Sequence, residues 1–171
     1  DIEKELHPLM LHLLQAGLKL LPVDGVLPSP VTVASGQYSL TRPLYVYTSA
    51  SVLQDQPEVA AFLSYYLQHA DDVRAETGFF PAPQELVDAG IERLNRAAGP
   101  TIAEPANATG AILAAGSSTV APLTEGAGAG FKAGGFGGTV AVDISGTAAG
   151  FEAFCSGQAD LVNASRAATR E

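Results

Sequence analysis

The chain has 171 residues, 47% of them hydrophobic, which is enough for one domain with a single sizeable core. It carries 18 acidic residues against 9 Lys and Arg, a formal net charge of −9, so its field repels nucleic acid and an anionic membrane surface, and neither is an expected partner. One cysteine excludes an internal disulfide, and His7, His12 and His69 lack metal-ligand spacing, so no metal site and no cofactor is expected.

Apolar periodicity predicts mostly helices in the first hundred residues. The expected helices cover residues 2–17, 30–35, 56–78 and 82–98, and the expected strands cover residues 18–23 and 42–50. Ser29 is a predicted N-cap with Pro30 at the first helical position, and Gly36 ends that short helix. The helix over 56–78 places Val59 and Phe62 on an apolar face, which indicates core packing.

Residues 98–109 lose this periodicity and collect Gly, Pro, Ala and Asn, which is typical of a linker. Strands are then expected over 110–116, 139–144 and 160–165, with helices over 119–131 and 147–157 between them. The alternation predicts an α/β fold with a mostly parallel sheet flanked by helices. Cys155 is expected to be a buried small hydrophobic residue.

The first strand-to-helix junction of this half runs from Gly116 to Thr119. The first N–H groups of a helix have no acceptor within it, and the helix dipole adds partial positive charge there, so the position suits an anion. Gly116 permits a tight turn, and Ser117, Ser118 and Thr119 place hydroxyl groups beside those amides. Taken alone, the junction favours simple N-capping by Ser118.

Two further junctions of the same kind favour a ligand site over simple N-capping. The second consists of Ser145, Gly146 and Thr147, and the third of Asn163, Ser165 and Arg166. Because the carboxyl ends of parallel strands meet at one edge of a sheet, all three are expected at the edge where open α/β folds bind ligands. Arg166 would add forked donors and a formal charge for an oxyanion, although a single Arg is more often solvated.

Enzymatic and nucleotide-binding alternatives have weaker support. The serine-containing turns hold no His or Lys as a base, and GSSTV is not a G-x-S-x-G nucleophile elbow, so no catalytic residue is expected. The glycine-rich stretches GAGAGF and GGFGG lack the Lys-Ser/Thr pair of a P-loop and the acidic partner of a dinucleotide fingerprint.

Three stretches together carry a family resemblance: LPVDGVLPSPVTVASGQYSLTRPLYVYTS, AAGSSTVAPLTE and ISGTAAGFEAFCSGQADLVNASRA. In these the chain resembles the phosphate-binding protein of ABC-type phosphate transporters, a class II periplasmic-type solute-binding protein. The similarity covers most of residues 18–97 and 110–168. It implies a two-lobed clamp that captures inorganic phosphate outside the cytoplasm, in the periplasm or at the cell surface, and passes it to a membrane permease without catalysis.

The resemblance also implies site residues. Ser118 and Thr119, with Ser117 alongside, match the family's first phosphate grip, and Ser145, followed by Gly146 and Thr147, matches the second. Arg166 stands in an ASR motif that part of the family uses, where other members have an Asp that accepts the phosphate proton. Without that carboxylate, discrimination between phosphate and sulfate is expected to be weak.

The order of the segments departs from the family. Residues 1–97 resemble the family's C-terminal segment and residues 110–171 its N-terminal segment, so the chain is expected to form one lobe through the linker 98–109, while the middle lobe is absent. The chain is either a piece of a tandem protein or a circular permutant reduced to one lobe, and a domain swap between molecules is possible in the first case. Half a clamp predicts weak binding unless a second lobe or another chain completes it.

A non-transport sensor or interaction module derived from such a lobe is the alternative function.

Overall fold

The computed structural model describes residues 19–99 and 101–168. The helices are α2 (Pro30–Ala34), α3 (Ala50–Asp55), α4 (Pro57–Gln68), α5 (Ala70–Thr77), α6 (Gln84–Ala98), the 3-10 turn η2 (Pro105–Asn107), α7 (Ala121–Ala133) and α8 (Thr147–Cys155). The strands are β1 (Tyr45–Tyr47), β2 (Ala111–Gly116), β3 (Thr139–Asp143) and β4 (Leu161–Ala164). The predicted helix over 2–17 lies outside the described residues.

The four strands form one sheet in the order β1-β4-β2-β3. Strand β2 is parallel to both β3 and β4, with Ala114 opposite Leu161 and Ala115 opposite Asp143. Strand β1 is antiparallel to β4 and occupies the edge, with Tyr45 opposite Ala164. The predicted α/β fold with a mostly parallel sheet is therefore confirmed.

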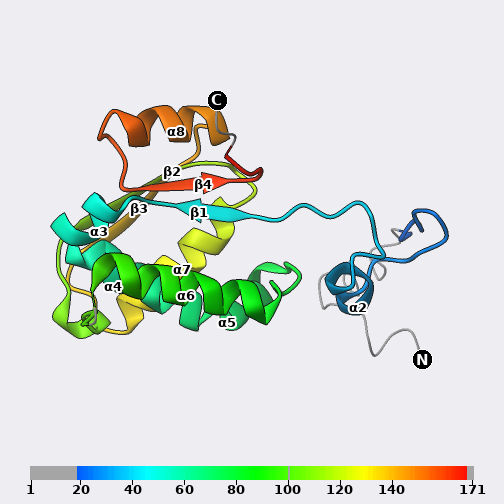
Figure 1. Ribbon diagram of the computed structural model, residues 1–171, viewed down its shortest axis with the longest axis horizontal. Helices are drawn as coiled ribbons and strands as arrows, with labels where there is room; N and C mark the ends of the chain where they lie inside the picture. Colours follow the sequence, from blue (N-terminus) through cyan, green and yellow to red (C-terminus); the bar gives the residue numbers. More distant parts are fainter. Residues whose placement is uncertain (1–18, 100, 169–171) are drawn as a thin grey trace.

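Helices cover both faces of this sheet. Helix α8 packs on one face against β2 and β4, while α4 and α7 pack on the other, with α6 against α4 and α5 against α7 (Figure 1). Phe62 of α4 and Phe131 of α7 are fully buried between them with ring centroids 5.5 Å apart, and Phe136 packs against Phe131 in a tilted arrangement with centroids 4.5 Å apart. Because Phe62 and Phe131 come from opposite sides of residues 98–109, the two halves of the sequence share one core.

Several element boundaries differ from the sequence prediction. The helix over 56–78 is two helices, since the backbone at His69 leaves helical geometry between α4 and α5 and its ring stacks on Tyr65 with centroids 4.0 Å apart. The strand expected over 42–50 is only three residues long, because Ser49 caps the additional helix α3 by accepting a hydrogen bond from the Val52 N–H. The strand expected over 18–23 is reduced to one bridge between Val23 and Val26.

The predicted cap of α2 is confirmed, whereas the predicted burial of Cys155 is wrong. The Ser29 hydroxyl accepts from the Thr32 N–H at 3.1 Å and Pro30 is the first residue of α2, as predicted. Cys155 is exposed at the last position of α8, so the expectation of a buried cysteine is wrong.

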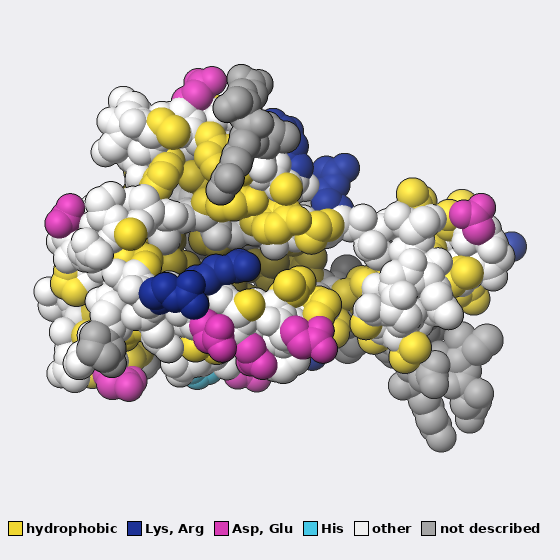
Figure 2. Space-filling view, viewed as in Figure 1, with side chains coloured by type: hydrophobic (Ala, Val, Ile, Leu, Met, Phe, Trp, Pro, Cys, Tyr) yellow, Lys and Arg dark blue, Asp and Glu magenta, His cyan; other side chains and the backbone are white. Residues whose placement is uncertain are grey.

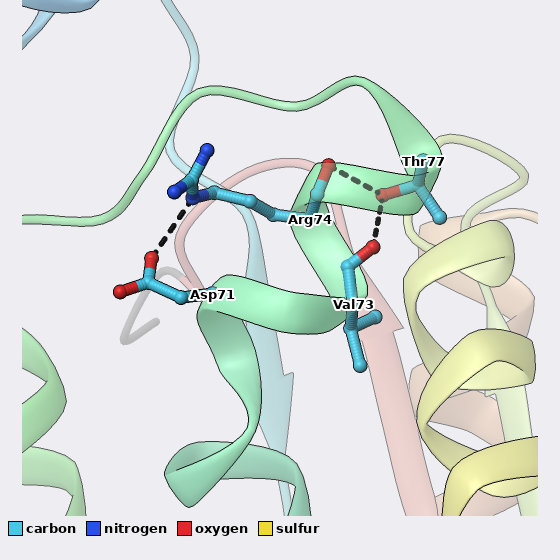
Figure 3. A network of polar contacts seen from close by, with 4 residues as sticks. All are labelled: Asp71, Val73, Arg74 and Thr77. Carbon is cyan, nitrogen blue, oxygen red and sulfur yellow. Dashed lines mark hydrogen bonds and ion pairs between the residues drawn. The ribbon is translucent and has the colours of Figure 1, made fainter.

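Helix α5 carries a set of local polar contacts along its length (Figure 3). The Thr77 hydroxyl donates to the Val73 carbonyl at 2.8 Å, and the Arg74 Nε donates to Asp71 Oδ1 at 2.8 Å. Gly78 then adopts a left-handed conformation, φ 84°, that terminates the helix. The guanidinium of Arg74 is therefore occupied by a local partner.

Residues 19–44, which include α2, extend away from the body as an arm (Figure 1). Large hydrophobic side chains of the arm, Leu21, Val31 and Leu40 among them, are exposed. Among the described residues no helix combines the length and the apolarity that crossing a membrane requires.

Candidate functional site

The three strand-to-helix and strand-to-loop junctions meet at one end of the sheet, as the sequence predicts. Direct hydrogen bonds join them: the Gly146 N–H donates to the Gly116 carbonyl at 2.8 Å, and the Ser117 N–H donates to the Asn163 carbonyl at 2.8 Å. The Ser165 N–H also donates to Thr147 Oγ1 at 3.3 Å. We call this end of the sheet, residues 116–120, 143–147 and 163–166, the junction edge.

The first junction is a tight turn built on Ser117, which is buried. Its hydroxyl accepts from the Thr119 N–H at 3.2 Å, and its carbonyl accepts from the Val120 and Ala121 N–H groups at 3.1 Å. Helix α7 has Val120 as its N-cap without a side-chain capping bond, so simple N-capping by Ser118 is wrong. The side chains of Ser118 and Thr119 are exposed at the junction edge.

Gly116 cannot be replaced without moving the backbone. Its φ is +135°, and a Cβ added to it would collide with the carbonyl oxygen of Asn163. The close approach of these two backbone segments is what allows the first and third junctions to lie side by side.

The second junction presents Ser145 and Gly146 to solvent. Gly146 has φ 90° and is the N-cap of α8, which has no side-chain capping bond, so the first amides of the helix point to the junction edge. Thr147 differs, because its side chain is buried and its Oγ1 lies 3.5 Å from the Ser165 Oγ. Thr147 therefore ties the second junction to the third.

The third junction has one exposed side chain, Arg166, and one buried side chain, Asn163. Arg166 is exposed, whereas Asn163 is fully buried and directed away from the edge towards α7. The Asn163 Oδ1 accepts from the Thr124 hydroxyl at 2.8 Å, and the Asn163 Nδ2 has no partner among the described residues. Asn163 thus supports the edge from behind through its backbone carbonyl.

Sequence reasoning missed the polar contacts behind this edge. Burial raises the pKa of Tyr66 to about 12, and a side-chain hydrogen bond with Thr124 opposes part of that rise. Tyr66, Thr124 and Asn163 therefore link α4, α7 and β4 in the interior. The signal available in the sequence was a threonine and an asparagine within otherwise apolar elements.

A separate hollow of about 450 Å³ runs along α7 and β3. Its lining includes Gly128 and Lys132 of α7 and Val140 and Val142 of β3. None of its lining residues belongs to the junction edge. The Lys132 Nζ donates to the Gly138 carbonyl at 2.7 Å. At the junction edge, Ser118, Thr119, Ser145, Gly146 and Arg166 are exposed to solvent.

The chemistry available at the junction edge is that of anion recognition. Exposed hydroxyls, helix N-terminal amides and the Arg166 guanidinium are all donors. His69 lies in the break between α4 and α5, away from the three junctions, and no group of three or more His, Cys, Asp or Glu in the described part of the chain could hold a metal ion.

Comparisons with known proteins agree with this chemistry. No protein-family model matches the chain. It is 36% identical to the protein SphX of Synechocystis sp. over 86 residues, which are 47% of this chain and 26% of that protein. It is 25% identical to the phosphate-binding protein PstS of Staphylococcus aureus over 67 residues, 39% of this chain and 20% of that protein.

One solved structure is similar over most of the chain. The phosphate-binding protein of a phosphate ABC transporter from Streptococcus pneumoniae superposes with a TM-score of 0.64 and 25% identity, over 88% of this chain and 52% of that chain. The chain thus spans about a quarter of the matched SphX protein and about half of the solved structure. The Staphylococcus aureus relative and the solved structure are both named as phosphate-binding proteins, which confirms the resemblance, and neither is named as an enzyme.

Proposed function

We propose that this homologue of phosphate-binding proteins is one lobe of a clamp that binds inorganic phosphate, or a similar tetrahedral oxyanion, for ABC-type uptake. The observation that carries the proposal is the hydrogen bonding of Gly146 to Gly116 and of Ser117 to Asn163, because it gathers three donor-rich junctions at one edge. The names of the relatives support phosphate as the anion. The site of action would be outside the cytoplasm, next to a permease.

The donors divide into two groups. Ser118, Thr119, Ser145 and the Gly146 turn face solvent and would contact the anion with Arg166. Ser117 and Thr147 are buried and would act from beneath, by holding their turns in place. Short-range donors can hold an anion against the net charge of −9, because distant charges are screened by salt.

The arrangement of the halves is also a proposal. Residues 1–97 would correspond to the C-terminal segment of the relatives and residues 110–171 to their N-terminal segment, joined by the linker 98–109. The shared core of Phe62 and Phe131 and the pairing of β1 with β4 support their folding as one lobe. A second lobe, from flanking sequence or from another chain, would complete the clamp.

A single open lobe leaves the anion exposed to water, so binding by this chain alone should be weak. Titration calorimetry with phosphate and sulfate, supported by ³¹P NMR line broadening for weak complexes, measures this directly. Saturable binding that the Ser145→Ala and Ser118→Ala variants weaken is expected. Tight phosphate-selective binding by the isolated chain would refute the half-clamp, and no interaction with either anion would refute the binding function.

The exposed apolar arm favours the second candidate, an interaction module. Leu21, Val31 and Leu40 are exposed on a segment that extends from the body. A pure interaction module should keep its protein partner after Ser145→Ala and Arg166→Gln, whereas a transport lobe should lose anion binding in the same variants.

A further inference from the structure

The direction of β1 brings the arm to the junction edge. Strands β2, β3 and β4 run parallel and end there, while β1 is antiparallel to β4, with Tyr45 opposite Ala164. The first residue of β1 therefore lies beside the last residue of β4. Figure 1 shows the arm entering β1 at the end of the sheet where β4 finishes.

This geometry places a second arginine, Arg42, beyond the same end of the β1–β4 pair as Arg166. Arg42 precedes Tyr45 by three residues, about 10 Å of extended chain, and Arg166 follows Ala164 by two. Pro43 restricts Arg42 to extended backbone conformations, which limits the directions that the residue can take. Two arginines from remote parts of the sequence thus lie within three residues of the paired Tyr45 and Ala164.

Both arginines are available to a ligand. Arg42 and Arg166 are exposed, and neither forms an ion pair with a side chain that the structure describes, in contrast to Arg74 with Asp71. Figure 2 shows Lys and Arg side chains gathered at the upper right of the body, where the chain enters β1 and leaves β4. In a protein of net charge −9, such a local excess of cations is unexpected for a surface without a role.

We propose that Arg42 is a second cationic residue of the oxyanion site, supplied by the arm, and that it favours dianions over monoanions. The inference rests on the proposed function and adds a determinant of specificity to it. A second guanidinium gains more from a ligand with two charges than from one with a single charge. The acidic residue that opposes this field at the junction edge is Asp143, the last residue of β3.

Arg42→Gln and Arg42→Lys test the proposal in the full chain. Calorimetry and ³¹P NMR titration with inorganic phosphate should show about two- to fivefold weaker binding for Arg42→Gln, the size of an exposed charge pair, and a smaller loss for Arg42→Lys. The loss should shrink as salt is added. Arg93→Gln is the matched control, because Arg93 is an exposed arginine on α6, and it should bind as the unchanged protein does.

Specificity gives a second readout. Sulfate and perchlorate are tetrahedral anions of charge −2 and −1, so Arg42→Gln should reduce the preference for sulfate over perchlorate, whereas a structural effect would weaken both equally. Circular dichroism and thermal unfolding of each variant establish that it is folded.

The possible failures are distinguishable. If the unchanged chain binds phosphate and Ser145→Ala weakens it, but Arg42→Gln matches Arg93→Gln, the role of Arg42 is refuted and the proposed function stands. If the unchanged chain binds neither phosphate nor sulfate, the proposed function and this inference are both refuted.

Discussion

Replacing Thr124 by valine should test whether the buried contacts behind the junction edge hold it together. Thr124 is fully buried, and its hydroxyl is the partner that the structure gives to the Asn163 Oδ1. Valine keeps the shape and removes the hydroxyl, so both polar atoms of the Asn163 side chain would be buried without partners. An unsatisfied buried acceptor costs about 1–3 kcal/mol, and we expect a loss of about 2 kcal/mol in the free energy of unfolding.

Urea denaturation followed by circular dichroism measures this loss, and thermal unfolding should show a midpoint about 4–8 °C lower. Thr124→Ser is the matched control, because it keeps the hydroxyl and removes one methyl group, at a cost of about 1 kcal/mol.

The double variant Thr124→Val with Asn163→Leu makes the test specific. The double variant removes the Asn163 amide that Thr124→Val leaves unpaired, so it should be more stable than Thr124→Val alone, while the loss of the Thr124–Tyr66 hydrogen bond is common to both variants. A Thr124→Val protein within about 0.5 kcal/mol of the unchanged chain would show that the hydrogen bond to Asn163 contributes nothing.

Three further predictions follow from the same structure. The pKa of Tyr66 is raised from 10.0 to about 12, so between these pH values the folded state keeps the phenol proton while the unfolded state loses it. The contribution of Tyr66 to stability should therefore be full below pH 10 and fall by about 3 kcal/mol as the pH rises to 12. Tyr66→Phe should remove this decline in urea titrations at alkaline pH. Gly116→Ala should lower the free energy of unfolding by about 2 kcal/mol or more, because φ is +135° and the added Cβ meets the Asn163 carbonyl oxygen. Gly25→Ala is the control: at φ +80° with nothing within 4 Å, it should cost only about 1 kcal/mol. Equal losses in the two variants would contradict the close-approach argument. Asp143→Asn should strengthen sulfate binding by less than about fivefold in calorimetry, since an exposed negative charge leaves the junction edge, and unchanged affinity would mean that Asp143 does not act on the anion.

Short-range features of the fold were predictable from the sequence. The alternation of strands and helices after residue 110 gave the mostly parallel sheet, and Ser29 with Pro30 gave the start of α2. The same alternation placed Ser117, Ser145 and Arg166 at one edge, because parallel strands end on the same side of a sheet. Periodicity and capping depend on residues a few positions apart, so they can be read locally.

Contacts between remote segments could not be read in this way. The break at His69 divides the helix that the sequence predicts over 56–78. The helix that begins at Ala50 shortens the strand predicted over 42–50. The side chain of Asn163, on β4, is buried and accepts a hydrogen bond from Thr124 of α7, although the sequence placed it with the exposed edge residues.

The sequence by itself determined an alternation of strands and helices with three donor-rich junctions, because each is a local pattern of apolar period and turn residues. Only the tertiary structure decided how these junctions bond to one another, which side chains face solvent, and that β1 runs antiparallel to β4, so that β1 begins at the end of the sheet where β4 finishes. The physical reason is that strand direction and burial are set by packing the whole core, including Phe62 against Phe131, and not by neighbours along the chain.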